Sequence, residues 1–415
     1  MTPVSKTAPG RSSLRPWLMF GLGLIWLFVL LWPLLGIKPD GALDFAETFA
    51  VWSRISAGAL ICMVIWRLRT NGTLGFLDAP AGALRDGFSR GAALVPRPVW
   101  LAALALLALT FPMYTERYAQ DVAVLVLVYV CLGLGLNVVV GLCGLLDLGY
   151  IAFYGVGAYT YALLSIHYDL SFWLSLPIAA CLAAIAGCII GYPTLRMRGD
   201  YLAIVTLGFG EIVRILLNNW MSLTNGPNGL LGIKSPGIYL PTFADGFSFE
   251  HIYLRKLDTL YYVILALAVF TIIAVYRLNF SRIGRAWEAI REDETAAEVM
   301  GVNTFLLKLL AYATGAAFGG LAGVFFAARM RFVSPESFSF MESVMVLAMV
   351  VLGGMGSIPG IILGALALIA LPEAFRGFEL YRMLAFGGAM TLMMLIRPAG
   401  LIPAGRMGKR GEEAE

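Results

Sequence analysis

The chain has 415 residues, of which 60% are hydrophobic and 13% are charged. A soluble domain carries about 25% charged residues, so this composition excludes an ordinary soluble protein and favours lipid as the surrounding solvent. The formal net charge of +4 is small, and the basic residues lie mostly in connecting segments, which indicates membrane topology and not affinity for nucleic acid.

The first 97 residues have the pattern of a two-span extension. Lys6, Arg11 and Arg15 precede an apolar run at 17–35. This run is longer than the apolar region of a signal peptide, which has about 7–15 residues, and no small-residue cleavage site follows it, so we expect a retained first span. A second apolar run at 47–66 leads into a polar linker. The predicted organisation is an extension with a cytoplasmic linker at 1–97, a core at 98–403 and a cytoplasmic tail at 404–415.

The core contains a series of apolar runs long enough to cross a bilayer, for which a helix needs about 20 residues. The predicted spans are 98–113, 121–141, 145–166, 172–193, 200–220, 259–277, 305–328 and 379–396. The longer run at 338–372 includes "LGGMGSIPG", in which Gly353, Gly354, Gly356 and Pro359 disfavour one straight helix. We expect two short spans or a re-entrant pair there. The predicted fold is an all-α polytopic bundle of about 10–12 transmembrane helices, some of them discontinuous.

Basic residues fix the expected orientation. They gather in the 67–97 linker, at Arg196 and Arg198, at the start of 282–303 and in the tail after Arg397. If these segments face the cytoplasm, both termini are cytoplasmic and the number of spans is even. Dividing 338–372 satisfies that parity. The long Gly- and Pro-containing loop at 221–258 then lies on the outer side.

Two Gly-broken apolar segments, 141–159 and 352–365, indicate where a path through the bundle would lie, since interrupted spans mark substrate sites in transporters. Ionisable residues within spans are costly and face a polar interior or a partner. Asp147 either caps a half-helix or lines the path. Glu211 and Arg214 share a helix face and form either a structural ion pair or part of the path. The candidate path residues are Asp147, Tyr150, Tyr154, Glu211 and Arg214.

The outer loop contains "TNGPNGL" at 224–230. Asn225, Gly226, Asn228 and Gly229 are candidates for receiving a delivery protein or for forming a gate. The alternative is turn chemistry alone, because Asn-Gly and Pro-Asn-Gly favour turns.

The stretch "RIGRAWEAIREDETAAEVMGVN" at 282–303 carries eight charged residues in 22 positions. Ile283, Trp287 and Ile290 fall on one helical face, so the segment is amphipathic and too charged to enter lipid. We expect two short cytoplasmic helices, with Asp293 or Thr295 as the cap of the second. Their apolar strip, continued by Ala297, Met300 and Gly301, is then available to dock a partner. The alternative is an ordinary solvated loop.

Residues that carry enzymatic chemistry are sparse. The five cysteines lie in or beside apolar runs without a CxxC pair, and the two histidines stand at the ends of apolar segments. No metal site is therefore expected. The Gly408-Lys409 pair is followed by Arg, so the chain lacks a phosphate-binding G-x-x-x-x-G-K-[ST] loop.

"TAAEVMG" at 295–301 resembles the Glu-Ala-Ala-x-x-x-Gly signature of ABC importer permeases, with Ala296, Ala297 and Gly301 matching and Thr295 in place of Glu. In that family the segment is a cytoplasmic coupling helix that contacts the ATPase. The residues this resemblance assigns to coupling are Arg285, Trp287, Ile290, Glu294, Thr295, Ala296, Ala297 and Gly301. Five motifs occur together and in order: "GLLDLGYIAFYGVGAYTYALL", "RMRGDYLAIVTLGFGEIVRILLNN", "TNGPNGL", "SRIGRAWEAIREDETAAEVMGVN" and "LGGMGSIPG". From about Pro98 to Pro403 the chain resembles the larger permease subunit of branched-chain amino acid ABC importers.

The resemblance implies a non-enzymatic transport subunit of the bacterial inner membrane that binds no cofactor, with ATP and Mg²⁺ on partner subunits. The implied partners are a second homologous permease, two cytoplasmic ABC ATPases, a periplasmic amino-acid-binding protein and the bilayer, but no nucleic acid. The implied substrate is leucine, isoleucine, valine or a related hydrophobic amino acid. Permeases for urea or short amides share these motifs and remain an alternative. A stand-alone secondary transporter is disfavoured by the scarcity of buried acids and histidines, and a membrane enzyme by the lack of a reactive cluster.

Overall fold

The computed structural model describes residues 97–374, except for 196, 198, 243–247 and 255, together with Phe49, Gly387, Thr391 and 400–402. The chain divides into two compact units, Met1–Ala103 and Leu104–Glu415. Apart from Phe49, Arg97, Gly387 and Thr391, the spans predicted at 17–35, 47–66 and 379–396, the linker and the tail lie outside the described residues.

The described part is a helical bundle with short strands. The longer helices are α4 (Arg97–Tyr114), α5 (Arg117–Asn137), α6 (Ile151–His167), α7 (Phe172–Thr194), α8 (Asp200–Asn219), α10 (Leu257–Asn279), α11 (Arg282–Glu292), α13 (Thr304–Met330) and α14 (Phe340–Gly353). The shorter helical segments are η1 (Val138–Leu142), α9 (Met221–Thr224), η2 (Gly226–Asn228), α12 (Glu294–Val299), η3 (Pro335–Phe338), α15 (Ile358–Ala365), η4 (Leu366–Ala370) and α16 (Leu371–Ala374). The strands pair antiparallel as β1 (Leu230–Leu231) with β4 (Phe332–Val333) and β2 (Gly237–Thr242) with β3 (Ser248–Tyr253). The predicted all-α class is confirmed.

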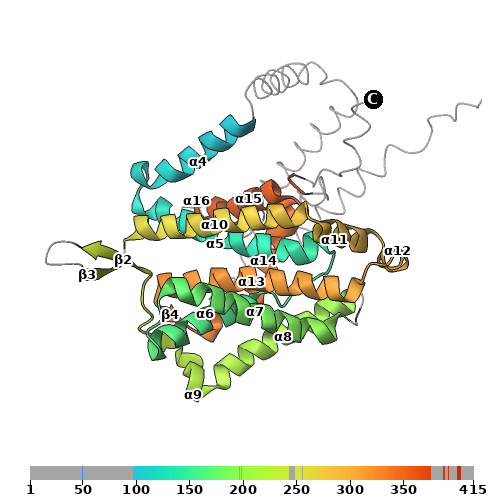
Figure 1. The fold of residues 1–415 in the computed structure, drawn as a ribbon, viewed down its shortest axis with the longest axis horizontal. Coiled ribbons are helices and arrows are strands. Elements are labelled where there is room, and N and C mark those ends of the chain that lie inside the picture. Colours follow the sequence, from blue (N-terminus) through green and yellow to red (C-terminus); the bar gives the residue numbers. More distant parts are fainter. Residues whose placement is uncertain are drawn as a thin grey trace, which may run out of the picture. The chain divides into compact units, whose positions relative to one another are not determined.

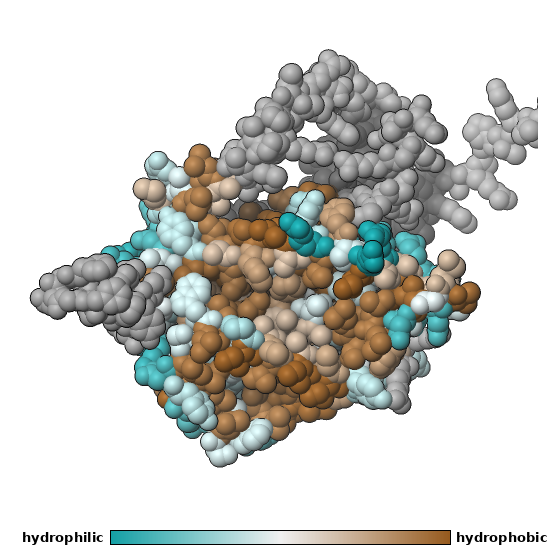
Figure 2. Space-filling view, viewed as in Figure 1, coloured by the Kyte–Doolittle hydropathy of each residue, from teal (hydrophilic) through white to brown (hydrophobic). Residues whose placement is uncertain are grey.

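Six helical segments among the described residues are long and apolar enough to span a membrane. They are Arg117–Leu142, Phe172–Thr194, Tyr201–Asn219, Leu257–Asn279, Thr304–Met330 and Pro335–Gly353, with shorter apolar helices at Ala105–Tyr114 and Ile358–Ala370. Figure 2 shows a hydrophobic band across the middle of one face, with hydrophilic residues toward the two ends of the helices. Ile189 and Phe270 are among the exposed large hydrophobic side chains of the described residues. A bilayer accommodates such an apolar surface, whereas water does not.

The central helix is α13, which packs against α7, α6 and α5 and runs beside them in Figure 1. Small residues allow the close approach: a Cβ on Gly157 of α6 would lie 2.2 Å from the carbonyl oxygen of Gly320 in α13. In lipid, helices associate through such close packing and not through the hydrophobic effect, so small residues concentrate at their interfaces.

The structure refines two of the predicted spans: the one at 145–166 starts later than expected, and the run at 338–372, for which the sequence predicts either two short spans or a re-entrant pair, is divided between α14 and α15. The span predicted at 145–166 begins later, because residues 143–150 are irregular and α6 starts at Ile151. The run at 338–372 is divided as predicted: α14 ends at Gly353, and α15 folds back against it. A Cβ on Gly364 would lie 2.5 Å from the carbonyl oxygen of Met349, which shows how closely the two arms of this hairpin approach.

Candidate functional site

The charged stretch forms two short helices, α11 and α12, which together with the turn at 300–301 we call the elbow (282–301). Figure 1 shows the elbow at one end of the bundle and the β2–β3 hairpin at the other. Ser281 caps α11 by accepting a hydrogen bond from the amide of Gly284 at 3.1 Å. Asp293 caps α12 by accepting from the amide of Ala296 at 3.0 Å. Of the two predicted caps, Asp293 is the N-cap residue, from which a carboxylate oxygen reaches an amide of the first turn that lacks a partner within the helix. Thr295 lies inside α12 and does not cap it.

The inner face of the elbow is attached to its own chain. Trp287, Ile290 and Ala297 are buried, and the indole Nε1 of Trp287 donates to the carbonyl oxygen of Leu307 at 2.7 Å. The expectation that these three residues belong to an apolar strip open to a partner is therefore wrong for this conformation. Their helical spacing reflects packing on α13.

The outer face of the elbow is exposed and partly apolar. Val299 and Met300 are each 82% exposed, and Thr295, Ala296 and Gly301 are exposed beside them. Gly301 has φ +86° with nothing near its missing Cβ. Arg285 is also exposed, and its guanidinium reaches the carbonyl oxygen of Phe280 at 3.4 Å. This outer face, and not the Trp287 strip, is the part of the elbow that another chain can contact.

Glu294 forms an ion pair with Lys308 of α13 at 2.5 Å. The Lys308 side chain is only 7% exposed, whereas that of Glu294 is 31% exposed. A buried ammonium is costly without a counter-charge, so Glu294 satisfies Lys308 and holds the start of α12 against α13.

The two Gly-broken segments predicted from the sequence lie in contact. After α5, the π-helical turn η1 ends at Leu142, and the amide of Gly356, in the break between α14 and α15, donates to Oδ1 of Asn137 at 2.8 Å. A Cβ on Gly141 would lie 2.6 Å from that same amide. We call this contact the junction: Gly141 from the first segment with Asn137 at the end of α5 just before it, and Gly356 from the second segment.

The break between α14 and α15 depends on glycine and on a cap. Gly354 has φ +112° and Gly356 has φ +85°, conformations that side chains disfavour. Ser357 accepts from the amide of Gly360 at 3.2 Å and starts α15, and Pro359 stands in the first turn, where it needs no amide donor. Gly353 touches the backbone of Gly360, which closes the hairpin.

Asp147, Tyr150 and Tyr154 are all buried. Oδ1 of Asp147 accepts from the amide of Gly149 at 2.9 Å, just ahead of α6, while its Oδ2 has no partner among the described residues. The Tyr150 hydroxyl donates to the carbonyl oxygen of Gly315 at 3.0 Å. Tyr154 packs against Phe326 and Phe338. The contacts of these three side chains indicate that they stabilise the broken segment and do not face an open path.

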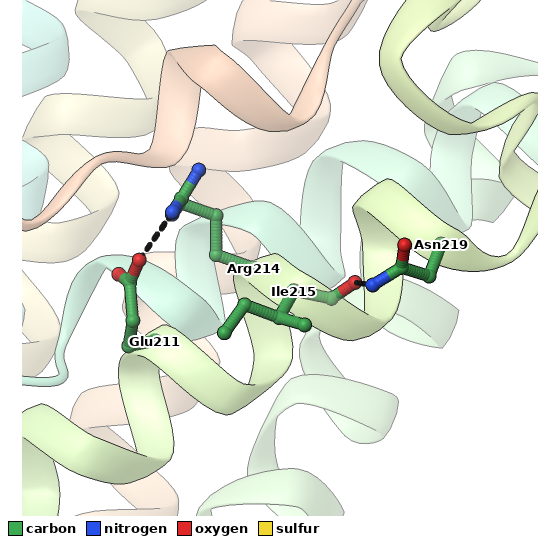
Figure 3. Close-up of polar contacts among 4 residues, drawn as sticks. All are labelled: Glu211, Arg214, Ile215 and Asn219. Atoms are coloured by element: carbon green, nitrogen blue, oxygen red, sulfur yellow. Dashed lines mark hydrogen bonds and ion pairs between the residues drawn. The ribbon is translucent and has the colours of Figure 1, made fainter.

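Glu211 and Arg214 form the ion pair that their spacing predicted. Figure 3 shows the two side chains pointing toward one another from α8, and Nε of Arg214 lies 2.7 Å from the Glu211 carboxylate. Their side chains are 36% and 32% exposed, respectively. A pair this open within a span is costly in hydrocarbon, so this face of α8 fits a polar path or a partner better than lipid.

The outer-loop candidates form a compact turn. Asn225 has φ +59°, and its side-chain amide donates to the carbonyl oxygen of Gly229 at 2.9 Å. Gly229 has φ +67° and no room for a Cβ beside Val333. Asn228 ends η2 next to it. The turn leads directly into the β1–β4 pair, so turn chemistry explains these residues, and a receiving or gating role stays a prediction.

Arg291 and Asn137 were not among the predicted site residues. Arg291 donates from Nη1 to the carbonyl oxygen of Gly141, and Asn137 is fully buried. The available signal for Asn137 was one amide side chain inside an otherwise apolar run. No group of three or more His, Cys, Asp or Glu suitable for a metal ion occurs in the described part of the chain.

The chain is similar to known permeases over most of its length. Residues 118–397 match the family described as the permease component of the branched-chain amino acid transport system. The high-affinity branched-chain amino acid transport system permease protein LivM of Escherichia coli strain K12 is 50% identical over 324 residues, which cover 75% of this chain and 76% of the relative.

A second type of permease from the same system is more distant. The permease protein LivH of Escherichia coli strain K12 is 26% identical over 287 residues, covering 66% of this chain and 91% of the relative. The permease protein BraD of Pseudomonas aeruginosa is 27% identical over 289 residues, with the same coverage. No solved structure matches the chain. The chain belongs to the family of branched-chain amino acid transport system permease components and is a permease subunit of the larger type.

Proposed function

We propose that this subunit carries leucine, isoleucine, valine or a similarly hydrophobic amino acid inward across a bacterial inner membrane. Two ATPase chains supply the energy by docking on the outer face of the elbow, and a binding protein delivers the substrate on the opposite side. The observation that carries the proposal is the two-faced elbow: Trp287 anchors it to the bundle, while Val299 and Met300 project from it unprotected.

The exposed residues of the elbow suit a docking role. Thr295, Ala296 and Gly301 are small and allow close approach of a second backbone. Val299 and Met300 supply apolar area for a buried centre, and the charged side chains around them supply a polar rim, as is usual at protein interfaces.

A second permease chain belongs to the same system, since LivM and LivH relatives from one bacterium carry permease names of that system. The exposed face of α8, with Ile212 and the Glu211–Arg214 pair, fits a position facing this second chain across the path. A zwitterionic amino acid offers an ammonium to Glu211 and a carboxylate to Arg214. Urea or a short amide has no charge to match, so the pair favours an amino acid.

The proposal is tested with vesicles that contain this chain, the second permease, the ATPases and the binding protein. Uptake of labelled leucine is expected to require ATP and all of these components. Ala296→Glu places a charge on the exposed face of the elbow and is expected to abolish both ATPase co-purification and uptake at an unchanged amount of chain in the membrane. Ala297→Glu is unsuitable, because Ala297 is buried and its loss of function would report on folding.

The matched control is Tyr168→Glu, which adds the same charge at an exposed position after the far end of α6. It should leave ATPase binding and uptake near the parent level. Leucine uptake by this chain alone, driven by an ion gradient and insensitive to ATP, would instead make it a stand-alone secondary transporter.

A further inference from the structure

We propose that Arg291 is a positioning residue that links the elbow to the junction of the two broken segments and thereby couples ATP hydrolysis to movement of the transport path. The inference rests on the proposed function, because it takes the elbow as the site where the ATPases act. It assigns a role to a side chain that touches neither the docking face nor the Glu211–Arg214 pair.

The first step is the reach of the Arg291 side chain. Arg291 lies in the last turn of α11, and its Nη1 donates to the carbonyl oxygen of Gly141 in η1, 150 residues away in sequence. Its stem lies over Gly144, where a Cβ would be 2.9 Å from Cγ of Arg291. Gly144 also has φ +77°. The stem of Arg291 therefore packs on a position where glycine leaves room for it, and the guanidinium binds a backbone carbonyl of the same segment.

The second step is electrostatic. Gly141 lies in the last turn of the continuous α5–η1 span, Arg117–Leu142. The carbonyl oxygens at a helix C-terminus lack partners within the helix and carry partial negative charge. A guanidinium from another element satisfies such a carbonyl and is attracted to that end, so the contact is favourable whenever the elbow approaches.

The third step carries the contact onward. Asn137 lies one turn before Gly141, and its Oδ1 accepts from the amide of Gly356 at 2.8 Å. A Cβ on Gly141 would lie 1.8 Å from that same Oδ1. The carbonyl held by Arg291 and the break between α14 and α15 are therefore joined through one buried amide side chain. A displacement of Arg291 is passed to both broken segments, which are the elements able to adopt two arrangements.

The fourth step separates this link from the attachment of the elbow. Trp287 and Glu294 bind the elbow to α13 through Leu307 and Lys308, so the elbow and α13 move as one body. Arg291 adds a hydrogen bond from the elbow to the end of the α5–η1 helix, beside the direct packing of α13 on that helix. A cavity of about 270 Å³ adjoins the link and is lined by Gly144, Arg291, Glu294 and Lys308 among others. It gives the guanidinium space to leave the Gly141 carbonyl and return during a transport cycle.

The test uses the complete complex in proteoliposomes and compares Arg291→Met, Arg291→Lys and Arg277→Met. Methionine keeps much of the stem but removes the charge and the donors, and lysine restores a cation. Arg277 is an exposed arginine in the last turn of α10, outside the elbow, and serves as the control. The measured quantities are the amount of ATPase bound, the rate of ATP hydrolysis and the rate of leucine uptake.

We expect Arg291→Met to keep the ATPases bound and to hydrolyse ATP within twofold of the parent, while uptake falls at least tenfold. The number of ATP molecules hydrolysed per leucine then rises at least fivefold. Arg291→Lys should recover part of the uptake, and Arg277→Met should match the parent. Thermal unfolding of the detergent-purified subunit serves as the check on folding.

Unchanged uptake by Arg291→Met would overturn the inference, and so would a parallel fall in bound ATPase, hydrolysis and uptake. Neither result touches the proposed function, which is tested separately on the parent subunit by its binding of the ATPases and its ATP-dependent uptake of leucine. A failure of the coupling link is thus distinguishable from a failure of the docking assignment.

Discussion

The indole nitrogen of Trp287 lies 2.7 Å from the carbonyl oxygen of Leu307, to which it donates a hydrogen bond. Leu307 is in the first turn of α13, the helix that contacts α5, α6 and α7. The elbow is thus anchored to the centre of the bundle by a fully buried side chain. A force applied to the outer face of the elbow reaches α13 without passing through a flexible loop.

Replacing Trp287 separates the contribution of packing from that of the hydrogen bond. Trp287→Phe keeps much of the ring but leaves the Leu307 carbonyl without its donor, which should cost about 1 kcal/mol of unfolding free energy. Trp287→Ala also leaves a cavity and should cost about 3–5 kcal/mol. Thermal unfolding in detergent measures both. Equal losses for the two variants would mean that the ring contributes little to attachment.

The Glu294–Lys308 pair should behave as a unit. Glu294→Gln leaves the buried Lys308 ammonium without its counter-charge; we expect a loss of roughly 2 kcal/mol, below the 3–5 kcal/mol of a fully buried pair because Glu294 is partly exposed. Lys308→Met in the same chain removes the stranded charge, so the double variant should regain most of the stability. A double-mutant cycle in thermal unfolding checks this, and additive losses would show that the two side chains act independently.

The sequence predicted the elbow's helices but not their orientation. The charge run with Trp287 and Ile290 at helical spacing indicated two short amphipathic helices, and α11 and α12 are present. An apolar strip looks the same in sequence whether it packs on its own chain or on a partner. Only the three-dimensional contact with Leu307 shows that the strip faces inward.

The junction was predictable in part. Glycines marked the first broken segment, and glycines with Pro359 marked the second, because these residues disfavour an uninterrupted helix. Their contact through Asn137 and Gly356 joins residues 219 positions apart. The spacing of residues along the sequence cannot predict a contact over such a distance. The contact of Arg291 with Gly141 was not predictable either, because an arginine within a run of charged residues looks in sequence like a solvated surface residue.

Substitutions of Asp147 test whether its role is to accept the hydrogen bond from the Gly149 amide or to supply a negative charge for transport. Its Oδ1 accepts from the Gly149 amide, and an asparagine oxygen can do the same. We expect Asp147→Asn to fold and transport near the parent level. Asp147→Ala leaves that buried amide unpaired and should lose about 1–3 kcal/mol of stability. Thermal unfolding and leucine uptake are the measurements. Loss of uptake in well-folded Asp147→Asn would assign the negative charge itself to the path.

The Glu211–Arg214 pair can be tested by neutralising both partners together. Glu211→Gln alone leaves an unpaired guanidinium within a span, which should lower the amount of chain in the membrane. Glu211→Gln with Arg214→Gln removes both charges and should restore that amount. If the pair faces the path, the KM for leucine uptake by the double variant should rise at least tenfold with the maximal rate little changed. A KM equal to that of the parent would leave the pair with a structural role alone.

Alanine is expected to have opposite effects on stability at two glycines, because one lies in the close contact of α6 with α13 and the other, in α8, has open space around it. At Gly157, a Cβ would lie 2.2 Å from the Gly320 carbonyl oxygen, so Gly157→Ala forces the helices apart and should cost about 1–3 kcal/mol. At Gly208 in α8, nothing lies within 4 Å of the added methyl group. Gly208→Ala should therefore gain about 0.5–1 kcal/mol from helix propensity. Thermal unfolding of the two variants should shift in opposite directions; destabilisation by Gly208→Ala would indicate instead that a second chain packs on that face of α8.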